Sequence, residues 1–242
     1  MRHFVSALCG ATLALAAPGF AQDQGGAGGA EVRQPVVVEL YTSQGCASCP
    51  PADEFLAELA GHEEVIALAL HVDYWDYIGW EDSFAQAAFT ERQKSYARVA
   101  KSRMIYTPQM IVGGVDRVEG HTPEAVVKLI GKHLAAERPV RLSVERQGDQ
   151  IVIRAVAEPP LIEGVEVQLV RYMPEAVVEI ARGENAGKTV TYHNIVTEWT
   201  KLADWPGLAP LELSAPAPGS DPVVVILQEA GPAAVLAAAR VK

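Results

Sequence analysis

Residues 36–61 have the sequence VVVELYTSQGCASCPPADEFLAELAG, and this stretch decides the fold that we expect. The apolar run at residues 36–41 predicts a strand buried on both faces. Asp53 and Glu54 fall where acidic side chains complement the dipole of a following helix. Apolar residues behind the strand follow the i, i+3, i+4, i+7 spacing of that amphipathic helix: Ala52, Phe55, Leu56, Leu59 and Ala60. The strand and the helix therefore hold Cys46 and Cys49 between them.

The spacing of Cys46 and Cys49 suits thiol–disulfide exchange. Unpaired amides at a helix N-terminus favour the thiolate, which is the attacking species. We expect Cys46 to be the nucleophile and Cys49 to resolve the mixed disulfide. Proline disfavours helical geometry at the residue before it, so Pro50 and Pro51 predict that the regular helix begins near Pro51. That placement would weaken the help of the dipole to Cys46.

Two other interpretations of the cysteine pair remain open. The pair could form a static structural disulfide, although such a small loop adds little entropic stabilisation. It could also belong to a soft-metal module, such as a copper carrier that uses Cys46, Cys49 and His71. A zinc site would need about four ligands, and the sequence has no second pair of this spacing.

Other residues fit the redox hypothesis. A cis bond at Thr107–Pro108 would expose the backbone of Thr107 for pairing with a substrate segment, whereas a trans bond would make an ordinary loop. Glu39 interrupts an apolar strand, and a carboxyl buried there could relay the proton of Cys49. Alternatively, the strand face of Glu39 is partly wet. His71 is a weaker relay candidate, and a hydrogen-bonded core histidine is the other interpretation.

The N-terminus predicts export. Residues 1–21 combine a positive Arg2, an apolar stretch at residues 4–17 and small residues before a cleavage point after Ala21. The apolar stretch is too short to span a bilayer, so we expect no membrane span after cleavage. A periplasmic or secreted location would allow a disulfide to persist. The Gly-rich residues 22–34 predict a flexible lead-in.

The remaining sequence predicts two domains. Residues 35–138 alternate strands and helices in the order β-α-β-α-β-β-α, which predicts a central mixed sheet flanked by helices. Residues 139–242 contain short runs of alternating polarity between turns, which predict an antiparallel, sandwich-like β-rich domain. The 20 basic and 30 acidic residues give a net charge of −10, which argues against a nucleic-acid partner.

Several stretches of this sequence resemble a known family: VELYTSQGCASCPPAD at residues 38–53, HVDYWD at 71–76, FTERQ at 89–93, YTPQM at 106–110, RGEN at 182–185 and YHN at 192–194. They are similar to exported thioredoxin-like proteins grouped as domain of unknown function 1223. The resemblance implies an α/β thioredoxin-like domain with a redox-competent site, but no established substrate. Ala47 and Ser48 replace the Gly-Pro that ordinary thioredoxins carry between the cysteines.

The sequence thus favours thiol–disulfide exchange with a protein thiol or disulfide partner. The expected site residues are Cys46, Cys49, Thr107, Pro108 and Glu39, and no organic cofactor is expected. A non-enzymatic binding protein with a structural disulfide is a further alternative. The sequence indicates neither the direction of electron flow nor an oligomeric state.

Overall fold

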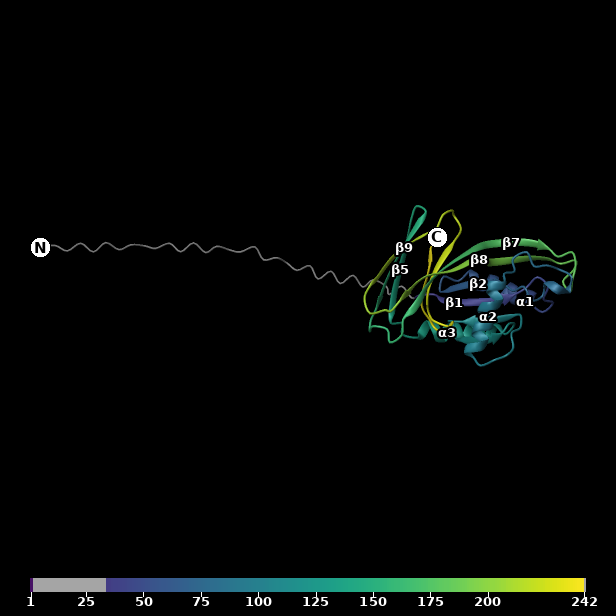
Figure 1. Cartoon of the computed structure of the whole chain (residues 1–242), viewed down its shortest axis with the longest axis horizontal. Helices are drawn as coiled ribbons and strands as arrows, with labels where there is room; N and C mark the ends of the chain where they lie inside the picture. The colour runs from purple at the N-terminus through teal and green to yellow at the C-terminus, as the bar shows by residue number, and fades with distance from the viewer. Residues whose placement is uncertain (2–33, 242) are drawn as a thin grey trace. The chain divides into compact units, whose positions relative to one another are not determined.

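The structure is a computed structural model that describes Met1 and residues 34–241 (Figure 1). Residues 34–241 belong to one compact unit. The predicted signal at residues 1–21 and nearly all of the lead-in at residues 22–34 lie outside the described residues. Within the described residues, no helix has both the length and the apolar character that crossing a bilayer needs.

The elements between residues 36 and 135 occur in the predicted order. They are β1 (Val36–Thr42), α1 (Pro50–Ala60), β2 (Val65–His71), the 3-10 turn η1 (Asp76–Ile78), α2 (Ala87–Val99), β3 (Gln109–Val112), β4 (Asp116–Glu119) and α3 (Pro123–Ala135). The remaining described residues form strands: β5 (Val140–Gln147), β6 (Gln150–Ala157), β7 (Val165–Glu179), β8 (Thr189–Trp205), β9 (Leu211–Pro216), β10 (Val223–Glu229) and β11 (Val235–Val241).

The predicted fold class is wrong, because strands from both halves of the chain form one sheet. In the described residues, an eight-stranded sheet has the order β11-β10-β7-β8-β2-β1-β3-β4, and β5-β6-β9 form a small second sheet. A bridge between Ala69 and Ile195 joins β2 to β8 in parallel. The chain is therefore neither a helix-flanked thioredoxin fold nor a fold with a separate sandwich domain. Alternating polarity predicted strands after residue 139 but carried no information about their partners.

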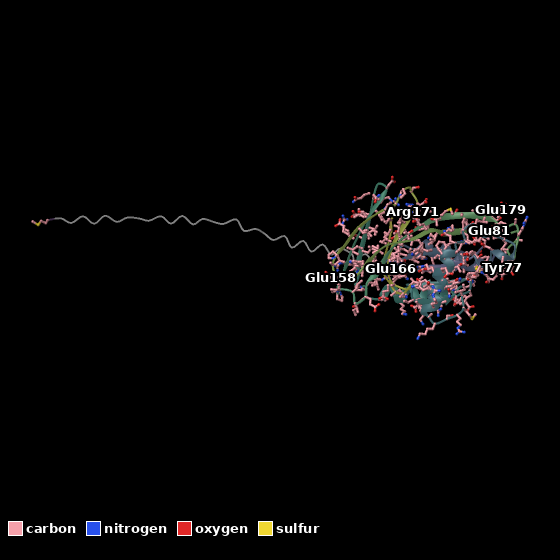
Figure 2. The ribbon with its side chains drawn as sticks, viewed as in Figure 1. Tyr77, Glu81, Glu158, Glu166, Arg171 and Glu179 are labelled. Atoms are coloured by element: carbon pink, nitrogen blue, oxygen red, sulfur yellow. A yellow bond between two sulfur atoms is a disulfide. The ribbon has the colours of Figure 1, made fainter. Side chains whose placement is uncertain are left out.

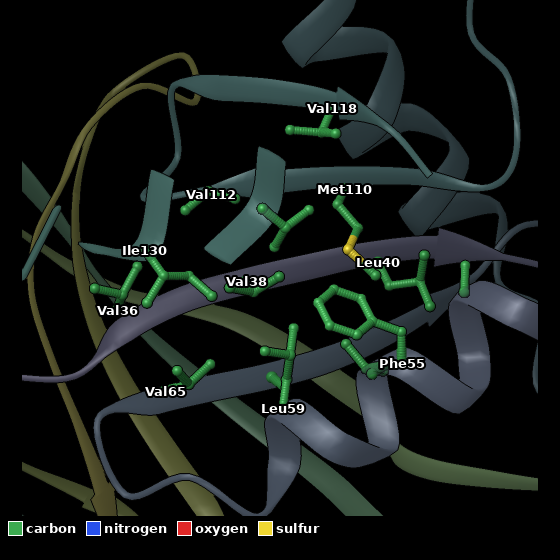
Figure 3. Packing of buried hydrophobic residues seen from close by; sticks show 14 of the residues in the cluster. Val36, Val38, Leu40, Phe55, Leu59, Val65, Met110, Val112, Val118 and Ile130 are labelled. Carbon is green, nitrogen blue, oxygen red and sulfur yellow. The ribbon is translucent and has the colours of Figure 1, made fainter. Parts of the chain in front are cut away.

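Both faces of the central strands are buried. β1 and β2 pair in parallel from Val36 opposite Val65 to Thr42 opposite His71, and every residue in both strands is buried. Figure 3 shows Phe55 and Leu59 of α1 packed toward β1 on one face. On the other face, side chains of α2 and of β10–β11 pack against the alternate positions of the same strands. This alternation sends neighbouring side chains of β1 to different environments.

The second half of the chain packs against the first at several points. A hairpin turn at Gly113 and Gly114 joins β3 to β4, with φ values of 62° and 78°. The amide of Val235 in β11 donates to the carbonyl of Gly113 over 3.0 Å. The small sheet covers the outer part of the large sheet, where β6 residues share a core with β7 and β10.

The long β7–β8 hairpin brings distant residues to the cysteine pair. These strands contain 15 and 17 residues and run side by side in Figure 1. Only the Val165–Arg171 part of β7 pairs with β10, so the distal part of the hairpin extends beyond that partner. β8 also packs against α1. The loop between β7 and β8 consequently reaches the turn that precedes α1.

Candidate functional site around Cys46 and Cys49

The two cysteines form a disulfide in the turn between β1 and α1. Cys49 is the N-cap residue and α1 begins at Pro50, one residue before the predicted start. Prolines at the first two helical positions carry no N–H, so the helix presents fewer free donors to Cys46. Ala47 and Ser48 are exposed, whereas Cys46 and Cys49 are only 1% and 0% exposed.

Asp53 lies one helical turn after Cys49, on the same face of α1. Its amide donates to the carbonyl of Cys49 over 3.1 Å, and residues four apart share a helix face. Within the described residues, neither of its buried carboxylate oxygens has a hydrogen-bond partner. Burial raises the pKa of Asp53 to about 7, although His71 and the nearby Thr42 hydroxyl, which lies outside hydrogen-bond geometry, act in the opposite direction. The arrangement places a carboxyl that titrates near neutral pH behind the disulfide.

From the sequence, Asp53 was expected only to complement the helix dipole. A signal for burial was nevertheless present, since Asp53 falls three residues before Leu56 in the apolar stripe. The stripe also contains Cys49, so the same spacing places the cysteine and the carboxyl on one face.

His71, at the end of β2, is a hydrogen-bonded core histidine. Its Nδ1 lies 2.7 Å from Oδ2 of Asp82, and its ring contacts Phe84 and Tyr192 edge-on. Its Nε2 is buried and has no partner among the described residues. Burial is the main cause that raises the pKa of Tyr192, and the charge of Asp53 adds to it. His71 and Asp53 therefore belong to one buried polar cluster, on the sheet face that α1 covers.

The structure does not assemble the ligand set of the metal alternative. Among the described residues, no group of three or more His, Cys, Asp or Glu side chains is placed to hold a metal ion. Cys46 and Cys49 are bonded to each other, and the Nδ1 of His71 is engaged by Asp82.

Asp82 also fixes the loop that carries the cysteines. Its Oδ2 accepts a hydrogen bond from the amide of Gln44 over 2.8 Å. The side chain of Gln44 accepts from Nε1 of Trp80 over 2.8 Å and donates to Ser83 over 3.2 Å. The segment after η1 thus holds the residues directly before Cys46. No motif in the sequence indicated this role.

Asn185 holds the same loop from the β7–β8 connection. Its Nδ2 donates to the carbonyls of Gln44 and Cys46, both over 2.9 Å, and the residue is 1% exposed. Nζ of Lys188 donates to its Oδ1 over 2.8 Å. Asn185 and Tyr192 both fall in stretches that resembled the family, but the sequence assigned a role to neither.

Thr107 and Pro108 lie close to the cysteine loop through Trp75. The Thr107–Pro108 bond is cis. Nε1 of Trp75 donates to the hydroxyl of Thr107 over 2.7 Å. Trp75 also packs against Gly45, where an added Cβ would lie 3.2 Å from the Cβ of the tryptophan. Trp75 therefore packs against the residue before Cys46 through its Cβ and hydrogen-bonds to the residue before Pro108 through its indole.

Glu39 lies on the opposite face of the sheet from α1. Its carboxylate accepts two hydrogen bonds from Arg92, each 2.8 Å long, and further bonds from the hydroxyls of Tyr41 and Tyr96. Burial acts to lower the pKa of Arg92, but Glu39 more than offsets this and the pKa is raised. The structure thus does not bring Glu39 together with the cysteines, and the strand face of Glu39 is buried rather than wet.

The aromatic residues around η1 differ in their exposure. Tyr77 is 83% exposed, whereas Trp75 and Trp80 are half-buried and hydrogen-bonded to the site. Figure 2 shows Tyr77 and Glu81 at the same end of the ribbon as Glu179, near the tip of the β7–β8 hairpin. The half-buried tryptophans are therefore part of the site, and Tyr77 is free at its surface.

Comparisons with known proteins find similarity along nearly all of the described chain. The crystal structure of protein AGR_C_4864 from Agrobacterium tumefaciens is 33% identical, with a TM-score of 0.73 over 85% of this chain and 93% of that one. HBP35 of Porphyromonas gingivalis shares the fold, with a TM-score of 0.62 at 11% identity over 86% of this chain and 75% of that one. No curated protein is significantly similar in sequence. Because a family profile described as "Protein of unknown function (DUF1223)" matches residues 37–228, the chain belongs to that family.

Proposed function

We propose that the protein carries out thiol–disulfide exchange through Cys46 and Cys49 with a protein thiol or disulfide partner. One observation carries the proposal: a disulfide precedes α1, and the buried, unpartnered carboxyl of Asp53 lies one turn behind it. A disulfide that serves only as a cross-link has no need of a proton acceptor. Exchange does need one, because each sulfur alternates between a bonded form and a thiol.

The proposed reaction transfers two electrons. A partner thiolate attacks Sγ of Cys46, the disulfide breaks, and Cys49 leaves as a thiolate. A second thiolate of the partner then attacks the partner sulfur in the mixed disulfide and releases Cys46. The partner becomes a disulfide, and both cysteines become thiols after taking up two protons in total. The steps run in reverse when the partner is the disulfide.

The buried residues have distinct roles in this scheme. Cys46 is the attacked sulfur in this scheme and Cys49, the N-cap residue of α1, is the leaving sulfur; the Sγ of Cys46 lies 3.5 Å from Oγ of the exposed Ser48. Asp53 gives a proton to the Cys49 thiolate and takes it back in the reverse direction. A carboxyl with a pKa near 7 suits both directions at neutral pH. Thr107 and Pro108 shape the edge where the partner docks, and the reaction requires no organic cofactor.

The proposed location is the periplasm or the outside of the cell. The export signal expected at residues 1–21 supports it, and an oxidising compartment would maintain the disulfide. There the partner would be another exported protein with a reactive cysteine.

Trapping and a redox titration test the proposal. In a Cys9→Ser background, the pair provides the remaining cysteines. A Cys49→Ser variant should accumulate mixed disulfides with its partner, and the matched Cys46→Ser variant should accumulate far fewer. Titration against glutathione should give a potential above about −300 mV. A lower potential together with an absence of trapped partners would identify a structural cross-link instead.

A further inference from the structure

The cysteine pair is more enclosed than an exchange reaction permits. Cys46 and Cys49 are 1% and 0% exposed, although the two residues between them are exposed. A thiolate must reach the attacked sulfur along the direction of the bond that breaks, so an enclosed sulfur reacts only after a local opening. The contacts that keep the loop in place therefore control how fast it reacts.

Asn185 contacts this loop from a distant part of the sequence. The carbonyls of Gln44 and Cys46 each accept one hydrogen of its amide group, and the two bonds span 141 and 139 residues of sequence. The bond from Lys188 to Oδ1 identifies the oxygen end of the side chain, which leaves the nitrogen end for the loop. Both hydrogens of the amide are used on the two sides of Gly45.

The tip of the β7–β8 hairpin is built to hold Asn185 in place. Residues 180 and 187 close the tip through a 2.7 Å bond from the amide of Gly187 to the carbonyl of Ile180. Gly183, at a φ of 76°, packs against Trp80, where an added Cβ would lie 3.2 Å from the Cβ of the tryptophan. Trp80 in turn donates to the side chain of Gln44. The tip and the segment after η1 thus hold the cysteine loop from two directions.

We infer that Asn185 is a latch: a positioning residue whose two hydrogen bonds keep the disulfide loop closed and slow the attack on Cys46. Exchange then requires the hairpin tip to separate from the loop. The latch would regulate the site in the proposed function, and its biological meaning rests on that function. The latch itself is a property of the disulfide loop and can be measured with a small reductant.

The expected effect follows from the two buried bonds. An amide-to-carbonyl bond stabilises its closed state modestly, but an unsatisfied buried carbonyl adds to the loss when the donor is removed. Removing the latch should raise the open fraction, and with it the rate of reduction, about tenfold.

The rate of disulfide reduction by a water-soluble phosphine, followed by thiol labelling, tests the latch. Asn185→Ala should be reduced about tenfold faster than the parent protein in the Cys9→Ser background. Asn194→Gly is the matched control, because Asn194 donates one buried bond to the carbonyl of Ala67 and has a φ of 48° that glycine adopts easily. Its rate should stay within about twofold of the parent. Equal rates for Asn185→Ala and the parent, or equal increases in both variants, would overturn the inference.

Asn185→Asp provides a readout that general destabilisation would not produce. The new side chain has the same shape, but when ionised it presents oxygen to both carbonyls. The reduction rate of Asn185→Asp, divided by that of the parent, should increase as the pH rises through the range where a carboxyl ionises. The ratio should be smaller at lower pH, where the carboxyl is protonated. A ratio that does not change with pH would contradict the latch. If Cys49→Ser traps no partner and the potential lies below about −300 mV while both Asn185 variants react faster, the proposed function fails and the latch stands. Successful trapping with unchanged reduction rates would support the proposed function and overturn the latch.

Discussion

Replacing Asp53 by Asn tests the buried carboxyl behind the disulfide. The carboxyl is enclosed, and within the described residues its oxygens have no hydrogen-bond partner. Burial without a partner penalises the ionised form, since water no longer solvates the charge. Asparagine has nearly the same shape and does not ionise. We therefore expect Asp53→Asn to stabilise the folded protein at alkaline pH and to have little effect at acidic pH.

The magnitude follows from the shift of the pKa. The pKa of Asp53 rises from 3.8 to about 7 in the folded protein, mainly because of burial. The folded state thus binds more protons than the unfolded state between these values, so the free energy of unfolding falls as the pH rises from about 4 to about 7. At about 1.4 kcal/mol per pH unit, this single group lowers the free energy of unfolding by about 4 kcal/mol above pH 7.

Urea unfolding of the oxidised protein at several pH values between 4 and 8 measures the effect. The difference in the free energy of unfolding between Asp53→Asn and the parent should grow by about 4 kcal/mol over this range. Glu54→Gln is the matched control, because Glu54 is the exposed neighbour on the same helix. At pH 8 its effect should be much smaller than that of Asp53→Asn, because an exposed side chain keeps its contact with water. A flat difference for Asp53→Asn would refute the reasoning that a raised pKa at Asp53 results from unpartnered burial.

Three further substitutions have definite expected outcomes. Glu39→Gln should lower the free energy of unfolding by about 3–5 kcal/mol, because Arg92 loses its buried partner, and chemical denaturation measures this loss. The same variant should leave the rate of disulfide reduction unchanged, and a slower rate would restore Glu39 as the proton relay. Gly114→Ala should cost about 3 kcal/mol in thermal unfolding, because Gly114 has a φ of 78° and packs against the β10–β11 turn. Trp75→Phe should cost about 1 kcal/mol in urea unfolding, because its donor to Thr107 is lost; an unchanged midpoint would show that this bond contributes nothing.

Local features of the sequence predicted much of the central part of the molecule. The apolar residues 36–41 and the stripe in α1 depend on neighbours within a few positions, and each element formed where it was expected. The Pro50–Pro51 pair likewise marked the start of α1 to within one residue. Such features can be predicted because secondary-structure propensity and hydrophobic periodicity act over short separations in the sequence.

The pairing partners of the later strands could not be predicted from the sequence. The alternating residues of β7 and β8 suit an edge, a sandwich or an extension of the first sheet equally well. β8 pairs with β2 at Ala69–Ile195 and also packs against α1, and both contacts join residues that are far apart in the sequence. The separate sandwich domain was therefore a reasonable expectation from pattern and still wrong.

The same distinction applies to the site. The sequence by itself determined the cysteine pair, the helix behind it and the Thr107–Pro108 step, because their chemistry depends on adjacent residues. Only the tertiary structure decided which carboxyl lies behind the disulfide. Side chains of β1 alternate between the two faces of the sheet, so Glu39 lies on the face opposite α1. Asp53 is part of α1 and follows Cys49 by one turn. Only the tertiary structure placed Asn185 on the cysteine loop, through bonds that span 139 and 141 residues. Contacts this distant form when strands pair and side chains pack, and no local pattern encodes them.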